Sequence, residues 1–264
     1  MYAGLKNLYN EFYQLGLVKR DVFLTRQRKI RTLEWSSIEQ YIPLGSSFLD
    51  IGCGKGHSMS LAMQNRNCIV SGVDPFPDHA GVAPNLNSQD NPFVIKKGVC
   101  ENLPFENQAF DIVYSSHMLE HTSDYHKSLT EMQRVLKDDG VMIMGVPTAT
   151  MAFIRLISIL LFSSHRNIIE LIRWPLRSEN WKKQQKISNF IIPPSHGNPS
   201  KNIFYDLNDY KIVQWRKRIS QYFNIQKEIY PALYSYPDFP KLFATHTRKR
   251  YSSSVFFIAT KKQG

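Results

Sequence analysis

The stretch FLDIGCGKG, residues 48–56, decides the fold of this chain. An apolar strand ends at the acid Asp50, and glycines then stand at positions 52, 54 and 56. Such a turn bends tightly and lets a ligand approach the main chain. A second apolar stretch, CIVSGVD, closes at Asp74. A glycine-rich turn followed by an acid at the end of the next strand predicts a nucleoside site, where the acid accepts the ribose hydroxyls.

The glycine spacing distinguishes between classes of nucleoside cofactor. The dinucleotide fingerprint G-x-G-x-x-G, counted from Gly52, requires a glycine where the chain has His57. The D-x-G-x-G-x-G spacing seen here instead resembles motif I of the class I S-adenosylmethionine-dependent methyltransferases. A sulfonium cofactor has no pyrophosphate, so no helix N-terminus has to point at one. The alternative is a tight strand-to-helix turn without a ligand.

Three later segments extend this resemblance. ENLPFENQAFDIV (residues 101–113) is similar to a segment of the small-molecule branch of that family, which contains the ubiquinone and menaquinone methyltransferases. SSHMLEH (115–121) resembles the tip of the family's fourth strand, and DGVMIMGVP (139–147) resembles the start of its fifth. The resemblance covers about residues 40–150. It implies an α/β fold: a Rossmann-like, mostly parallel seven-stranded sheet with helices on both faces.

The resemblance implies S-adenosyl-L-methionine as the cofactor. In one place the chain departs from the family, which commonly has an acid after the glycine that ends the third strand; here Gly98 is followed by Val99. Adenine must then be held by backbone groups near Cys100 and Glu101 and by apolar contacts. The expected cofactor-binding residues are Asp50, Gly52, Cys53, Gly54, Gly56, Asp74, Pro75, Cys100, Glu101, Asn102 and Ser115.

Histidines are the candidate catalytic residues. Methyl transfer is an in-line displacement, and a carbon or oxygen nucleophile must also lose a proton, a task suited to histidine near neutral pH. His117 and His121 follow the fourth strand, where the methyl group should point, and His196 lies on a later loop. A continuous helix would place His117 and His121 on one face. No H-E-x-x-H motif and no third ligand are evident, so no metal site is expected. Each histidine could instead be a polar or surface residue.

Length and cysteine content suggest the class of protein. The 264 residues fit one large domain, or one domain with an insertion. No window reaches 18 consecutive apolar residues and the N-terminus lacks a signal-peptide pattern, so we expect a cytoplasmic protein. Cys53, Cys68 and Cys100 show no C-x-x-C spacing and are expected to be buried free thiols in a reducing compartment.

Positive charge is concentrated in the later part of the chain. Residues 1–150 hold 14 Lys and Arg against 16 Asp and Glu, whereas residues 151–264 hold 19 against 6. This asymmetry indicates an anionic partner, which could be a membrane, a nucleic acid or a phosphorylated substrate. A solvated basic surface is the plainer alternative.

The chain is expected to divide into a helical N-terminal cap (1–40) and a methyltransferase domain (41–264) that carries a helical insertion at 148–201. The first insertion stretch, residues 151–162, is nearly all apolar and has the length of a buried or interfacial helix. In the next stretch one helical face is polar and the rest is mostly apolar, with a tryptophan. Such a helix is expected either to lie at an anionic membrane surface or to form a lid over the active site. The polar face comprises Arg166, Glu170, Arg173 and Arg177.

Apolar runs and turn residues place the remaining elements. A helix is expected from Tyr125 to Lys137, and Asp206 is expected to cap another that reaches about Tyr222. Residues 75–92 read mostly as loop. Strands are expected at about 47–51, 68–73, 93–97, 111–115, 141–146, 225–229 and 255–260.

Three functions fit these observations. The first is a methyltransferase acting by O- or C-methylation on a small, lipid-like or glycan-linked acceptor, located either free in the cytoplasm or peripherally at the inner face of the cell membrane. The second is an RNA methyltransferase; it is disfavoured because the fourth strand ends in Ser-Ser-His-Met without an N-P-P-[FY] motif, and because no RNA-binding module is recognisable. The third is a non-catalytic scaffold that binds the cofactor.

Overall fold

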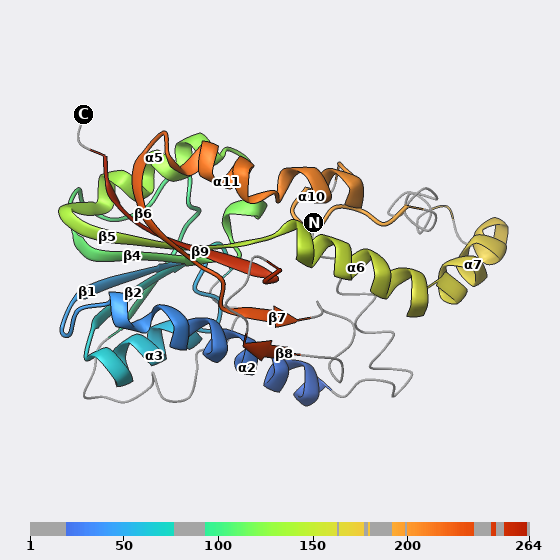
Figure 1. The fold of residues 1–264 in the computed structure, drawn as a ribbon, viewed down its shortest axis with the longest axis horizontal. Coiled ribbons are helices and arrows are strands. Elements are labelled where there is room, and N and C mark those ends of the chain that lie inside the picture. Colours follow the sequence, from blue (N-terminus) through green and yellow to red (C-terminus); the bar gives the residue numbers. More distant parts are fainter. Residues whose placement is uncertain are drawn as a thin grey trace.

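The computed structural model describes residues 20–76, 93–162, 164–176, 179, 192–198, 200–234, 244–246 and 251–262. A seven-stranded sheet in the order β3-β2-β1-β4-β5-β9-β6 forms its centre (Figure 1). Only β9 runs antiparallel to its neighbours, β5 and β6, so the expected mostly parallel Rossmann-like sheet is confirmed. The strands are β1 (Ser47–Ile51), β2 (Ile69–Asp74), β3 (Val94–Lys97), β4 (Phe110–Ser116), β5 (Leu136–Pro147), β6 (Phe223–Ile229) and β9 (Ser254–Lys261).

Helices cover both faces of this sheet. Figure 1 shows α2 (Arg20–Ile38) and α3 (His57–Arg66) on one face, and α5 (Tyr125–Val135), α10 (Ile203–Asp209) and α11 (Ile212–Ile219) on the other. The apolar stripe of α5 is buried as its helical spacing indicates. On the opposite face, Trp35 of α2 packs edge-on against Phe48 and Tyr114.

Parallel pairing determines where the functional groups gather. Asp50 of β1 stands opposite Gly72 of β2 and Tyr114 of β4. The carboxyl ends of these three strands therefore open at one edge of the sheet, which is where ligands bind in open α/β folds.

Two expected elements differ in the structure. Asp206 caps no helix: the side chain of Asn202 caps α10, and the expected single helix is divided at Tyr210 into α10 and α11. The reason is that the Asp206 carboxylate is buried, where it accepts hydrogen bonds from the loop before the helix. The helix expected to reach Lys137 ends at Val135, since the chain enters β5 at Leu136.

A small ribbon beside α2 was not expected from the sequence. It consists of β7 (Ala232–Tyr234) paired antiparallel with β8 (Ala244–His246). Its importance lies in Tyr234, which is buried against the end of β4 and takes part in the hydrogen-bond network at the candidate site.

The segment after β5 is helical. It contains α6 (Ala149–Phe162), α7 (Ser164–Arg173) and the single turn η4 (Trp174–Leu176), which extend away from the sheet in Figure 1. None of the helices within the described ranges has the length and apolarity needed to cross a membrane. The division into cap, domain and insertion stays a prediction. Residues 1–19 of the cap, the loop at 77–92 and Arg177 lie outside the described residues.

Candidate active site

A cavity of about 360 Å³ opens at the carboxyl ends of β1, β2 and β4. Apolar side chains and backbone make up one part of its wall, and histidines and hydroxyl groups make up another. The residues that line it are Ile51, Gly52, Val73, Asp74, Pro75, Gly98, Val99, Cys100, Glu101, His117, Met118, His121, Thr122 and Ser123.

The glycine turn forms one side of this cavity. Gly52, Gly54 and Gly56 all have positive φ angles, of 76°, 51° and 74°, which other residues rarely adopt. At Gly52 there is also no room, because an added Cβ would lie 2.7 Å from Cγ of Met118. The turn is therefore held close to the loop after β4, and Gly52 is the glycine of the turn that lines the cavity.

Asp74 ends β2 at the cavity wall. Its Oδ2 accepts a hydrogen bond from the backbone N–H of Gly54 at 3.0 Å, and its Oδ1 accepts one from Phe76 at 2.8 Å. Each carboxylate oxygen has a second lone pair, so the oriented group can still accept bonds from two ribose hydroxyls.

Asp50 lies beneath the turn and does not line the cavity. Burial is the main cause that raises its pKa, to about 7; the charge of Arg31 opposes the rise and that of Asp74 adds to it. Asp50 is therefore a buried residue two positions before Gly52, and its side chain is not part of the cavity wall.

The opposite end of the cavity is built from the turn after β3. Val99 and Asn102 form an isolated antiparallel bridge. Oε1 of Glu101 accepts hydrogen bonds from the backbone N–H and the hydroxyl of Ser123, at 2.8 and 2.9 Å. Glu101 therefore joins this turn to the loop after β4 and fixes the width of the cavity.

His117 is fixed by its neighbours. Its φ angle is positive, 53°, and its ring Nε2 lies 3.2 Å from Oε1 of Glu34 and 3.0 Å from the hydroxyl of Tyr234. Oε1 of Glu34 also accepts hydrogen bonds from Tyr234 and Ser254, at 3.0 and 2.6 Å. Burial and the charge of Arg31 act to lower the pKa of His117, but Glu34 and Glu120 outweigh them and raise it. This network favours an imidazolium at the end of β4.

His121 and His196 come together from distant parts of the chain. Their ring centroids are 4.8 Å apart with the rings nearly perpendicular. His121 belongs to the single turn η3 (Leu119–His121), so no continuous helix relates it to His117. Burial, reinforced by the nearby charge of His121, lowers the pKa of His196 to about 3, which leaves this imidazole neutral.

The expected site residues fall into two groups. Gly52, Asp74, Pro75, Cys100, Glu101, His117 and His121 line the cavity. The remainder do not line it, and among them His196 packs against the ring of His121. Those that do not line the cavity are Asp50, Cys53, Gly54, Gly56, Asn102, Ser115 and His196.

Sequence reasoning missed three residues of this region, namely Glu34, Glu120 and Tyr234. Glu120 could have been found, because it lies inside the SSHMLEH segment beside His121. Glu34 and Tyr234 gave no signal, since only the fold brings α2 and β7 to the end of β4.

The cavity fits S-adenosylmethionine. Glycines that leave no Cβ in the turn, an oriented carboxylate for the ribose and apolar walls at Ile51, Val73 and Val99 suit a nucleoside. The turn after β3 offers backbone groups for adenine, in place of the acid that is absent at Val99.

The comparisons with known proteins agree with this geometry. Residues 49–144 match the family model described as a methyltransferase domain. An uncharacterised protein of Methanocaldococcus jannaschii is 32% identical over 143 residues, which cover 54% of this chain and 51% of the relative. The ubiquinone/menaquinone biosynthesis C-methyltransferase UbiE of Campylobacter jejuni is 30% identical over 113 residues, covering 39% of this chain and 45% of that enzyme. This chain thus spans about half the length of these curated relatives.

A solved structure is similar over nearly the full length. A methyltransferase of Thermotoga maritima that depends on S-adenosylmethionine, described as a possible histamine N-methyltransferase, matches with a TM-score of 0.55. The identity is 15%, and the match covers 99% of this chain and 98% of that one. At this identity the likeness shows the fold alone. The match to a methyltransferase domain, together with the glycine turn and Asp74, implies S-adenosyl-L-methionine as the cofactor.

Proposed function

We propose that this chain, a class I S-adenosylmethionine-dependent methyltransferase by family and fold, transfers a methyl group to a small, lipid-like or glycan-linked acceptor by O- or C-methylation. The observation that carries the proposal is the single cavity wall shared by Gly52, Asp74 and His121. A cofactor whose ribose is held by Asp74 would extend along the glycine turn toward the end of β4. Its methyl group would then point toward the histidines.

The residues divide the work between binding and proton transfer. Asp74 would hold the ribose, and the turn at Cys100 and Glu101 would hold the adenine. The bound cofactor supplies an activated methyl group on a positively charged sulfur, so the protein mainly aligns the acceptor and excludes water. His121 has a side chain 28% exposed at the cavity and is the better placed base, because His117 is already engaged by Glu34 and Tyr234.

The exposed side chains of the helices after β5 favour an apolar, lipid-like acceptor. Ile168, Ile169 and Ile172 of α7 are exposed, with Ile172 at 72%, and Leu176 of η4 is 87% exposed. Arg173 on the same helix is exposed as well. Exposed apolar side chains beside basic ones are typical of a helix at an anionic membrane surface, where a lipid or lipid-linked glycan would enter. These features support our proposal that the enzyme acts on the cytoplasmic side, peripheral at the inner face of the cell membrane.

The experiment supplies S-adenosylmethionine carrying a labelled methyl group together with cell extract separated into lipid, RNA and aqueous fractions. We expect label in the organic-soluble fraction, and much less when Asp74 is replaced by Asn. Asp138→Asn is the matched control, because Asp138 lies at the start of β5 and pairs with Lys261. Label confined to RNA would favour the nucleic-acid alternative. A protein that binds no cofactor would contradict the proposed activity itself.

A further inference from the structure

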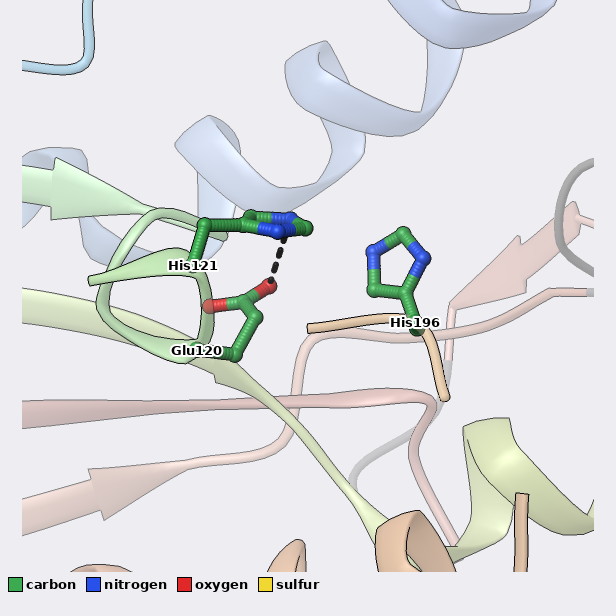
Figure 2. Close-up of side chains that lie close together, drawn as sticks. All are labelled: Glu120, His121 and His196. Carbon is green, nitrogen blue, oxygen red and sulfur yellow. Dashed lines mark ion pairs between the residues drawn. The ribbon is translucent and has the colours of Figure 1, made fainter. Parts of the chain in front are cut away.

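Three side chains that could bind a metal ion meet beside the cavity. Glu120 and His121 belong to η3, and His196 belongs to the loop 192–198; Figure 2 shows them converging. One potential ligand atom from each residue lies within 4.8 Å of the others. Two imidazole nitrogens and a carboxylate oxygen form the donor set of many catalytic zinc sites and of other first-row metal sites.

The surroundings of the Glu120 carboxylate also point to a bound metal ion. The Glu120 side chain is 0% exposed, and among the described residues neither of its oxygens takes part in a hydrogen bond. Its Oε1 forms two long ion pairs, with Nδ1 of His117 at 3.6 Å and with Nε2 of His121 at 3.9 Å, and both distances exceed that of a hydrogen bond. A buried carboxylate that accepts no hydrogen bond is costly, because such groups normally accept hydrogen bonds or bind metals. A metal ion between Glu120, His121 and His196 would supply the direct bond that the Glu120 oxygens lack.

The loop that carries His196 is held rigidly in this place. The backbone N–H of His196 donates to Oδ2 of Asp206 at 2.7 Å, and Ser195 donates a short hydrogen bond to Oδ1 of the same carboxylate. Arg155 of α6 donates to the carbonyl of Pro194 at 3.0 Å and lies 3.5 Å from Asp206. The loop is therefore anchored from α6 and α10 at once.

Gly197 brings the loop into contact with η3. An added Cβ at Gly197 would lie 2.2 Å from the carbonyl oxygen of Glu120. The two segments thus touch backbone to backbone, and His196 can reach the space in front of the Glu120 carboxylate. Only glycine permits this close approach, so Gly197 is what allows the loop to hold His196 near Glu120.

We infer that Glu120, His121 and His196 bind a divalent transition-metal ion, with zinc or manganese as the leading candidates. Bonds of about 2.1 Å at a tetrahedral ion place ligand atoms roughly 3.4 Å apart, so the ligand atoms, now up to 4.8 Å apart, must approach one another by up to about 1.4 Å on binding. Three protein ligands leave a coordination position open. Because His121 lines the cavity, that position faces the acceptor side.

The inference rests on the proposed function and narrows its acceptor to a molecule with a hydroxyl group. With the ion bound, His121 would act as a metal ligand and not as the base. The hydroxyl oxygen would bind the open position, and the metal would lower the pKa of the hydroxyl so that its proton passes to water. The oxygen lone pair then forms the new C–O bond at the cofactor methyl. The C–S bond breaks, and its electrons remain on sulfur as the neutral thioether.

The test is a calorimetric titration of the tag-free, EDTA-treated full chain with Zn²⁺, Mn²⁺ and Mg²⁺, with Co²⁺ absorption spectra as a second readout. We expect one equivalent of Zn²⁺ or Mn²⁺ to bind and Mg²⁺ to bind much more weakly, because imidazole ligands disfavour it. Glu120→Gln and His196→Ala should each weaken binding at least tenfold and remove the cobalt spectrum. His126→Ala is the control, since His126 lies on α5 and contacts Tyr222.

Cofactor binding is measured on the same samples. A wild-type protein that binds S-adenosylmethionine but no metal would overturn this inference and leave the proposed function intact. Metal binding that is unchanged in both variants would assign the ion to another place and overturn it as well. A protein that binds metal but no S-adenosylmethionine would contradict the proposed function instead. Circular dichroism identifies any variant that fails to fold. In that case the titration of the wild-type protein still tests whether it binds one equivalent of metal.

Discussion

His117 at the end of β4 forms an ion pair with Glu34 of α2, with 3.2 Å between Nε2 and Oε1. Glu34 is fully buried and is also paired with Arg31 at 2.6 Å. The contact joins the helix before the sheet to the wall of the cavity. It makes α2 part of the active-site framework, although α2 precedes the cofactor motif in sequence.

Replacing Glu34 by Gln tests this framework. The change removes the carboxylate that faces the buried His117 and the partly exposed Arg31, so we expect a loss of about 3 kcal/mol in the free energy of unfolding at pH 6. Because the pKa of His117 is raised, the contribution of the pair is present at low pH and falls as the pH rises through that pKa. Urea denaturation measures both effects. Glu39→Gln is the control, because Glu39 makes only an exposed hydrogen bond with Asn65. Equal stabilities of the two variants would contradict the prediction.

Asp74 is expected to control affinity for the cofactor. Asp74→Ala would remove the two charge-assisted bonds that we propose to the ribose, together with the acceptor for Gly54 and Phe76, so binding of S-adenosylmethionine should weaken by about a hundredfold. Calorimetry measures the affinity, and Asp138→Ala should match the wild type. An Asp74→Ala protein that keeps wild-type affinity would show that the ribose lies elsewhere.

Asp50 makes the stability of the ligand-free protein depend on pH. Burial raises the pKa of Asp50 to about 7, against 3.8 normally, so the folded state holds a proton that the unfolded state has lost. Between about pH 4 and pH 7 this group therefore destabilises the fold as pH rises, by about 4 kcal/mol in total. Asp50→Asn mimics the protonated acid. The free energy of unfolding of the wild type minus that of the variant should fall across this range, and a constant difference would refute the assignment.

Gly197 should matter for catalysis more than for cofactor affinity. In Gly197→Ala the new methyl group would collide with the Glu120 carbonyl, so the loop must move and carry His196 away from His121. We expect methyl transfer to fall at least tenfold while the affinity for S-adenosylmethionine changes little. Ser200→Ala, an exposed change near the same loop, is the control. If Gly197→Ala kept wild-type activity, the position of His196 would not matter for methyl transfer.

Membrane association is tested on α7 and η4. Wild-type protein should sediment with anionic vesicles and much less with neutral ones. A variant carrying Ile172→Glu, Arg173→Glu and Leu176→Glu should stay in the supernatant, whereas Val213→Glu, at an exposed apolar position on α11, should sediment like the wild type. Failure of the wild type to sediment would leave these helices as a lid and direct the acceptor search to water-soluble molecules.

Local sequence patterns were sufficient for most of the fold. The strand before Gly52, the acid at Asp74 and the apolar stripe of α5 are short-range signals, and the structure has them at nearly the expected positions. The expected cap at Asp206 was wrong for a physical reason. An aspartate near a helix start is usually a cap, and nothing local shows that this one is buried facing Ser195 and Arg155.

The sequence by itself determined the cofactor half of the protein. Glycines at fixed spacing and acids at strand ends act through backbone geometry a few residues away, so their meaning is visible in the chain. Only the tertiary structure decided the side of the site where the acceptor would bind. Glu34, Tyr234 and His196 reach the end of β4 from separate segments. The contact of Gly197 with the Glu120 carbonyl places His196, the third potential metal ligand, beside Glu120 and His121. Contacts between distant segments arise from the packing of the whole fold, which no local pattern encodes.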